Sequence, residues 1–454
     1  MIRSKKIQLL RKDNTKLGKI RIFAIAMRTT KHTFFCLAMI LLTALTTASC
    51  EKWRKKKEVD PERVFILYSA GFSNLSPSLT EDIQDLLSGD IPAKNSADVV
   101  LVISRKTSDA SGRDYVKETE PYLFRVYRTK NKAVCDTLFA LPAGSSLADA
   151  DNMRTMLSKA AELFPVKHYG MVLSSHATGW VPAGYYASPN MYRSSSGPLR
   201  SSRIPAVDPP GMDEPGFILT KALGPEYYNN GGIRYAHEMD IDALASAIPF
   251  RLDYLLFDAC LMGGVEVAYE LRNVAGLIGF SQAETLSDGF NYRKMAGHLT
   301  GSPDPEAVCR DFYEQYASRS GNYKSATVSL VNTAGLDRLA SACKPLFEKY
   351  RSAIASLDRN NVQGFGGTKH WYYDLVDVLE QAGATAGELA SVRSALQSCI
   401  EYAAHTGQYY SMYGGLYPID AFCGLSMYLP SAGSSYLDNF YRNIPWNQAA
   451  GLVK

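Results

Sequence analysis

The apolar and polar positions of the chain predict short buried strands that alternate with amphipathic helices. Short continuous apolar runs are typical of strands covered on both faces of a sheet, and they occur at 63–69, 97–104, 171–173, 255–257, 277–281 and 326–331. Helical spacing of apolar residues occurs at 79–87, 148–164, 238–248, 265–271, 308–318 and 336–355. Because strands that alternate with helices form parallel sheets, the sequence predicts an α/β fold with a mostly parallel, doubly covered central sheet.

The C-terminal part is expected to be a helical subdomain at 346–454, which follows a main domain at 62–345. A strand-like run at 423–429 is expected to return to the sheet. The helical pattern itself is found at 371–381 and 386–406.

Two of the strand-like runs end in residues that suit nucleophilic catalysis. The run 255–257 is followed by Cys260 and a glycine pair that allows a sharp turn into a helix. The run 171–173 is followed by two serines and His176. At the carboxyl ends of parallel strands, where open α/β sheets bind their ligands, a turn and a helix amino end favour a thiolate. A cysteine and a histidine at one sheet edge therefore predict a nucleophile and its base.

Each of these two residues also has an ordinary structural interpretation. A lone cysteine in an apolar setting is usually a small core residue, and a lone histidine is usually a hydrogen-bonded one. The matching strand-end contexts of Cys260 and His176 favour catalysis, because ordinary packing does not predict the match.

The sequences FDACLMGGVEVAYEL, around Cys260, and LSSHATGW, around His176, resemble the clostripain-like cysteine peptidases, which belong to the group of caspase-like folds. The resemblance runs from about Val64 to Leu429. It implies a caspase-like α/β/α sandwich and a cysteine endopeptidase that acts through a dyad of these two residues. The family usually has an acidic or amide residue before the histidine and a glycine after it, where this chain has Ser175 and Ala177.

The resemblance also implies which substrates are cleaved. Clostripain-like enzymes cut peptides after Arg or Lys and use an acid at the floor of the pocket, and the matching residue is Asp258. A carboxylate there pairs with a guanidinium or ammonium group; the alternative is that Asp258 caps the following turn. The oxyanion is expected against the backbone N–H groups of Cys260 and Ala177. No cofactor is required, and calcium is implied by the resemblance alone.

The segment 181–234 is too rich in Pro, Gly, Ser, Tyr and Asn for a predicted helix or strand, and it is expected to be a long insertion over the site. In the clostripain-like family this region can contain a point of self-processing after a basic residue. An ordinary role as solvated loop charges is the alternative for each candidate. The candidates are Arg193, Arg200, Arg203, Lys221 and Arg234.

The amino terminus predicts export. Basic residues precede the apolar run 34–45, and small residues then lead into Cys50, as in a secretory signal that ends in a bacterial lipoprotein cleavage site. We expect 1–49 to be the signal segment, with Met27 as the true start, Cys50 to be lipidated, and 50–61 to be a polar tether. The protein is then anchored by lipid to the periplasmic or outer face of the bacterial cell envelope.

Charge and cysteine content exclude other classes. The net charge of +4 falls to −5 once residues 1–50, with ten Lys/Arg and one Asp, are set aside, so nucleic acid is not an expected partner. The six cysteines after Cys50 have irregular spacing without a CxxC pair, which predicts neither a zinc site nor a dense disulfide framework. Two rivals to the peptidase remain: an inactive surface lipoprotein that uses the fold as a binding module, and a cysteine peptidase of different preference.

Overall fold

The computed structural model describes part of the chain, and the fold is given for that part alone. The described residues are 59–71, 75–105, 120–130, 132–185, 203–205, 226–230, 233–368, 371–412, 414–430 and 435–454. The expected signal segment, Cys50 and most of the expected tether lie outside these residues.

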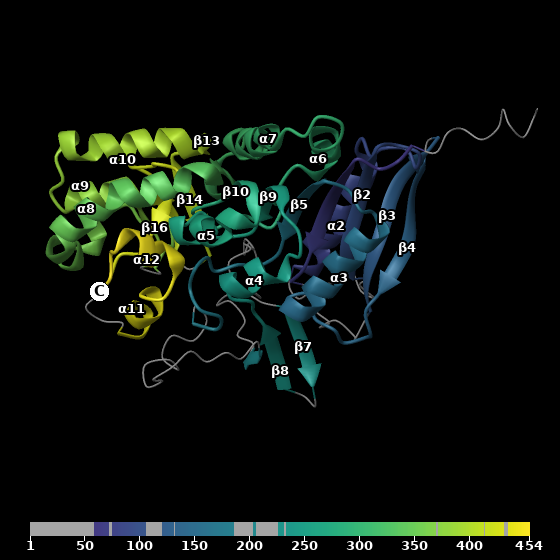
Figure 1. The fold of residues 1–454 in the computed structure, drawn as a ribbon, viewed down its shortest axis with the longest axis horizontal. Coiled ribbons are helices and arrows are strands. Elements are labelled where there is room, and N and C mark those ends of the chain that lie inside the picture. Colours follow the sequence, from purple (N-terminus) through teal and green to yellow (C-terminus); the bar gives the residue numbers. More distant parts are fainter. Residues whose placement is uncertain are drawn as a thin grey trace, which may run out of the picture. The chain divides into compact units, whose positions relative to one another are not determined.

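A nine-stranded sheet runs through the described chain (Figure 1). Its strands are β1 (Arg63–Ser69), β2 (Asp98–Arg105), β3 (Pro121–Thr129), β4 (Lys132–Ala140), β5 (His168–Ser174), β9 (Leu252–Asp258), β10 (Ala275–Phe280), β11 (Thr327–Asn332) and β13 (Ile400–His405). Their order across the sheet is β13-β11-β10-β9-β5-β1-β2-β3-β4. The inner strands β2, β1, β5, β9 and β10 pair in parallel, and the outer ones pair antiparallel. The predicted mostly parallel central sheet is confirmed.

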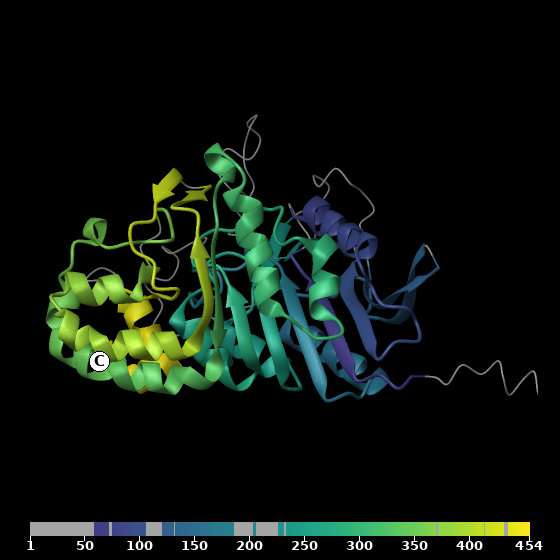
Figure 2. The same cartoon turned by 90° about the horizontal axis from the view of Figure 1, so that it is seen from above.

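Helices cover both faces of this sheet (Figure 2). One face is covered by α2 (Ser76–Ser88), α6 (Tyr292–Leu299) and α7 (Pro305–Ala317), the other by α3 (Ala150–Leu163), α4 (Ile241–Ala247) and α5 (Val265–Glu270). In β1, Phe65 and Leu67 pack in the core beneath the first group of helices, and Ile66 and Tyr68 in the core beneath the second. Because both faces of the strand are buried, its central residues 64–68 are apolar or aromatic. The α/β/α sandwich is thus confirmed.

The chain after β11 is mainly helical. Its helices are α8 (Leu336–Ala355), α9 (Leu375–Gln381), α10 (Ala386–Cys399), α11 (Ser435–Tyr441) and α12 (Pro445–Ala450). Two small antiparallel pairs accompany them, β12 (Tyr373–Asp374) with β16 (Ser426–Met427) and β14 (Gln408–Ser411) with β15 (Gly415–Pro418). Short 3₁₀ helices occur in this part at Thr333–Gly335 and Arg359–Asn361, and before β11 at Leu271–Asn273 and Gly321–Tyr323. The division of the chain at residue 346 stays a prediction.

Two expectations for this part are wrong in detail. The helix expected over 386–406 ends at Cys399, and Ile400–His405 forms β13, which pairs with β11 of the central sheet. Pairing with a distant strand overrides the local helical spacing there. The run 423–429, expected to return to the sheet, contains only the two-residue strand β16, which pairs with β12.

The segment 181–234 contains more regular structure than expected. Three short strands, β6 (Arg203–Pro205), β7 (Glu226–Asn230) and β8 (Ile233–His237), form a separate sheet in the order β6-β8-β7. Each is too short to give a readable alternation of apolar and polar residues, so sequence patterning missed them. In the described part of the chain, no helix has the length and apolar character needed to cross a membrane.

Candidate active site

The two predicted catalytic residues follow neighbouring strands of the sheet. β5 and β9 pair in parallel, and their last residues, Ser174 and Asp258, are register partners. His176 and Cys260 each lie two residues beyond this pair. Because both strands run in the same direction, both residues leave the sheet at the same edge. The two residues thus follow neighbouring strand ends, as expected, and their catalytic role stays a prediction.

This edge is also where the strand order reverses. From β1 the chain adds β2 on one side and then β5 on the other. Open α/β sheets bind their ligands in the crevice that such a reversal leaves at the carboxyl ends of the strands.

The loop that carries His176 packs directly on the turn that carries Cys260. Gly179 in the histidine loop has φ +65°, and a Cβ there would lie 2.5 Å from the carbonyl oxygen of Leu261. Only glycine fits both the left-handed backbone and the close approach. The N–H of Ser175 also donates to the carbonyl of Asp258 at 3.3 Å. The two loops thus form one contiguous structure.

The cysteine turn has an unusual backbone. Leu261, immediately after Cys260, has φ +61°, a left-handed conformation that is rare for a residue with a side chain. Its N–H donates to the carbonyl of Ala283 at 3.1 Å, and the N–H of Gly263 donates to that of Ser281 at 2.7 Å. The segment after β10 therefore lies alongside the turn and holds it.

The sulfur of Cys260 is buried and has a backbone donor. The side chain has 0% exposure, and the N–H of Thr285 donates to its Sγ at 2.9 Å. In the thiol form, Sγ can donate in turn to the Thr285 carbonyl oxygen at 3.5 Å. The loop after β10 that contains Thr285 resembles the corresponding family loop in sequence, but no role was predicted for Thr285 itself.

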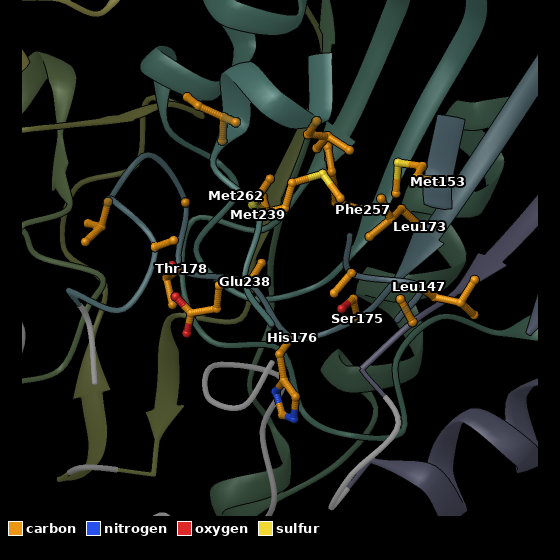
Figure 3. A pocket seen from close by; sticks show the side chains of 18 residues that line it. Leu147, Met153, Leu173, Ser175, His176, Thr178, Glu238, Met239, Phe257 and Met262 are labelled. Atoms are coloured by element: carbon orange, nitrogen blue, oxygen red, sulfur yellow. The ribbon is translucent and has the colours of Figure 1, made fainter. Parts of the chain in front are cut away.

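A cavity of about 100 Å³ lies beside His176 (Figure 3). Its walls are mainly apolar, with Leu173 and Phe257 from the strand ends and Met262 from the cysteine turn, and Ala177 also lines it. Figure 3 shows the imidazole of His176 directed away from these apolar side chains. An apolar cavity thus lies next to the proposed base.

Glu238, the first residue of the expected helix 238–248, gives this cavity a titratable group. The N–H of Gly184 donates to its carboxylate. Burial raises the pKa of Glu238 to about 7; the Gly184 hydrogen bond opposes this rise, and the nearby Asp240 carboxylate adds to it. Glu238 therefore changes its charge near neutral pH.

Asp258 is buried and points to the other face of the sheet from Phe257. Its exposure is 1%, its Oδ2 accepts from the hydroxyl of Ser174 at 3.3 Å, and the hydroxyl of Tyr292 donates to the same oxygen. A Cβ on Gly289 would lie 2.2 Å from this Oδ2, so that loop approaches the carboxylate closely. Burial and the Asp258 charge raise the pKa of Tyr292 well above its usual value, which keeps the phenol a donor.

A second, larger cavity of about 470 Å³ adjoins Tyr292. It is lined by the carboxylates of Asp288 and of three α2 residues, Glu81, Asp82 and Asp85, with two arginines. Each arginine is paired, Arg293 with Asp85 at 2.8 Å and Arg319 with Asp288 at 2.7 Å. The spacing of the acids in α2 puts them on one helix face, a signal that the sequence analysis did not use.

The remaining predicted site residues are only partly described. Arg203 lies in β6 opposite His237, and Arg234 lies in β8 opposite Asn229. Arg193, Arg200, Lys221 and Cys50 lie outside the described residues. Within the described ranges, no group of three His, Cys, Asp or Glu side chains could hold a metal ion, and calcium dependence stays a prediction.

An α/β/α sandwich with a cysteine and a histidine after adjacent parallel strands defines the class of caspase-like cysteine peptidases. The clostripain family model matches residues 217–442, which include the Cys260 turn and end before the last helix. The chain belongs to the clostripain family, whose members are cysteine endopeptidases. A comparison with curated protein sequences found no match.

Solved structures of similar fold agree with this assignment. An inactive zymogen C11 protease from Parabacteroides distasonis is 22% identical, with a TM-score of 0.67 over 86% of this chain and 99% of that one. A secreted C11 cysteine protease from Bacteroides thetaiotaomicron is 22% identical, with a TM-score of 0.66 and the same coverage. A complex of such a protease from that organism with an irreversible peptide inhibitor is 21% identical, with a TM-score of 0.65 and again the same coverage. At these identities the likeness establishes the fold.

Proposed function

We propose that the protein cleaves peptide bonds by a dyad in which Cys260 attacks the scissile carbonyl and His176 transfers the proton. The observation that carries this proposal is the register of β5 with β9, which puts both residues two positions beyond one pair of partners. In the first step the sulfur forms a thioester and the leaving amine takes a proton from the imidazolium; water then releases the acid. The N–H groups of Cys260 and Ala177 are the proposed donors to the oxyanion.

We further propose that the bond cleaved follows Arg or Lys. Asp258 is buried, and the hydroxyls bonded to it come from Ser174 and Tyr292, which belong to other elements. This supports a pocket role over the alternative of a turn cap. The acidic cavity beside Tyr292 adds negative potential in the same region. A cationic side chain is favoured there and a neutral one gains nothing.

Self-processing in the segment 181–234 is part of the proposal. Cys260 has no exposed surface in the described form, so a peptide substrate, which is far bulkier than a small alkylating reagent, reaches its sulfur only after a covering segment moves. Cleavage after one of Arg193, Arg200, Arg203, Lys221 or Arg234 is a means of releasing such a segment. Incubation of the wild type should then yield two chains, and Cys260→Ala should stay single.

We propose export and lipid anchoring through Cys50, with Met27 as the start. The support is the order of basic, apolar and small residues before Cys50. Intact-mass analysis of the protein from a bacterial envelope should show a diacylglyceryl group on that cysteine; an unmodified or earlier amino terminus would contradict the proposal.

The rival function is an inactive lipoprotein that binds partners, and Ser175 and Ala177 are the observations that favour it. A fluorogenic peptide with Arg or Lys before the reporter separates the two functions. Wild type should release the fluorophore, and Cys260→Ala should lose activity by several orders of magnitude. Equal signals from both proteins would contradict a peptidase that cuts after Arg or Lys, and would leave the binding module and a cysteine peptidase of different preference as the alternatives.

A further inference from the structure

We propose that the segment Ser281–Thr285 is a rigid brace that presents the backbone N–H of Thr285 to the sulfur of Cys260 and thereby stabilises its thiolate. This inference rests on the proposed role of Cys260 as the nucleophile. It assigns Thr285 as a positioning residue for the reaction, in addition to His176.

The contact itself is short and excluded from water. Thr285 N lies 2.9 Å from Cys260 Sγ, and the two residues are 3% and 0% exposed. A hydrogen bond donated to an ionised group is stronger than one to its neutral form, and more so where the dielectric is low. The N–H therefore favours the thiolate over the thiol.

A buried nucleophile needs such a donor. Cys309, a buried cysteine in α7, shows what burial does: burial, with nearby Glu306 and Asp304, raises the pKa of its thiol to about 12. A thiol with that pKa is almost wholly protonated at neutral pH and is a poor nucleophile. The N–H of Thr285 opposes this effect at Cys260, because a donor to the charged form lowers the pKa.

The backbone of the brace is aligned with the cysteine turn. Gly263 donates to the carbonyl of Ser281 at 2.7 Å, and Leu261 donates to that of Ala283 at 3.1 Å. The hydroxyl of Thr285 reaches back to the carbonyl of Ala259 at 3.4 Å. The two backbone hydrogen bonds fix the register of the two segments, so the N–H of Thr285 falls opposite the sulfur.

Buried polar side chains then anchor the brace to the rest of the fold. The hydroxyl of Ser281 pairs with that of Thr327 in β11 at 2.8 Å. The amide of Gln282 donates to the Gly424 carbonyl at 2.8 Å, and the carboxylate of Glu284 accepts from the Met412 N–H at 3.1 Å. Apolar side chains would fill this space without needing partners. The polar network instead fixes the position of the loop, which the proposed donor requires.

The test compares two variants at one position by the pH dependence of Cys260 alkylation. Thr285→Pro removes the N–H, whereas Thr285→Val removes only the hydroxyl. Full-length protein is treated with iodoacetamide across a range of pH, and modification of Cys260 is read by peptide mapping. We expect the midpoint to rise by about one to two pH units in Thr285→Pro and to stay in place in Thr285→Val.

A proline can distort the backbone of the brace in addition to removing the N–H donor. A second substitution therefore removes the donor without a proline ring. Replacement of residue 285 by the corresponding α-hydroxy acid converts its amide to an ester and deletes the N–H alone. Circular dichroism and thermal melting establish that the protein is folded. A midpoint unchanged from wild type in the folded ester protein would overturn the inference.

The alkylation needs no substrate, so its outcome is independent of the proposed peptidase reaction. A rise of the midpoint in a protein that cleaves no peptide would support the stabilised thiolate but overturn the proposed function, and with it the role of Thr285 in the reaction. If the protein is an active peptidase and its alkylation midpoint is the same with and without the Thr285 N–H, the proposed function is retained and the inference is overturned.

Discussion

The hydroxyl of Tyr441 donates a hydrogen bond of 2.7 Å to the carboxylate of Glu266, in the helix that follows the Cys260 turn. The N–H of Tyr428 donates to the same oxygen, also at 2.7 Å. Glu266 is 1% exposed, and it joins the C-terminal part of the chain to the helix behind the proposed nucleophile.

This carboxylate should make stability depend on pH. Burial raises the pKa of Glu266 from 4.5 to about 7, so the folded protein keeps a proton that the unfolded chain has released. The associated stability is complete below pH 4.5 and is lost as the pH rises through about 7. In the wild type, the free energy of unfolding should fall by an amount on the order of 3 kcal/mol between pH 4.5 and a pH above 7 because of this group. We expect Glu266→Gln to lack this fall.

Urea denaturation of both proteins at a series of pH values measures this decline. Glu238, with its pKa also raised to about 7, is unchanged in the variant and keeps its own contribution. Parallel stability curves for wild type and Glu266→Gln would contradict the prediction.

The contact between the two catalytic loops should be sensitive to a single methyl group. Gly179→Ala adds a Cβ that would lie 2.5 Å from the Leu261 carbonyl, at a residue with φ +65°. Gly321→Ala is the matched control, because Gly321 has φ +58° but no atom within 4 Å of its added Cβ. The free energy of unfolding of the control should fall only by about 1–2 kcal/mol, the cost of placing a residue with a Cβ in the left-handed backbone conformation.

We expect Gly179→Ala to lose about 1–3 kcal/mol more than this control in denaturant unfolding. Its kcat/KM should fall as the histidine loop moves away from the cysteine turn. Equal losses in the two alanine variants would mean that the loops separate at little cost.

The charge of Asp258 should set the preference for basic residues. Asp258→Asn keeps the size of the side chain and an oxygen that can accept from Tyr292, but it removes the negative charge. We expect kcat/KM for an Arg or Lys peptide to fall about 10²–10³-fold. Tyr292→Phe removes the donor and keeps the carboxylate, so it should still prefer basic peptides. Retained preference in folded Asp258→Asn would assign specificity to another residue.

The role of His176 can be tested against a second histidine, His168, which lies in β5. His176→Ala should lower kcat about 10²–10⁴-fold, since it removes the proposed proton carrier. His168→Ala is the control, because His168 lies at the opposite end of β5 and pairs with Asp253 at 2.9 Å. Steady-state assays with one peptide measure both. Similar kcat values for the two variants would remove His176 from the dyad.

Local signals predicted the sheet and the placement of the pair. An apolar run followed by Cys260 or His176 is contained in a few consecutive residues, so it could be read without tertiary information. The end of α10 at Cys399 could not be predicted in this way, because β13 is a strand only through its pairing with β11. The helical spacing of the sequence continues through that boundary, and a partner distant in sequence decides the outcome.

The surroundings of the site were also beyond local patterns. The donor at Thr285 is a backbone group, so its residue type carries no trace of the contact. The acids of α2 lie more than 170 residues before Asp258 in the chain and meet its neighbour Tyr292 only in the folded cavity. Residue types predicted the two candidate catalytic groups, whereas the atoms that surround them became visible only in the fold.

Several anchors around Cys260 come from residues more than 120 positions after their partners in the chain. Gln282 bonds to Gly424, Glu284 to Met412, and Glu266 to Tyr428 and Tyr441. A ribosome releases these residues after the cysteine and the histidine, so a nascent chain has both of them before it has these supports. A premature stop before Met412 leaves the catalytic motifs intact in a product that lacks every one of these anchors.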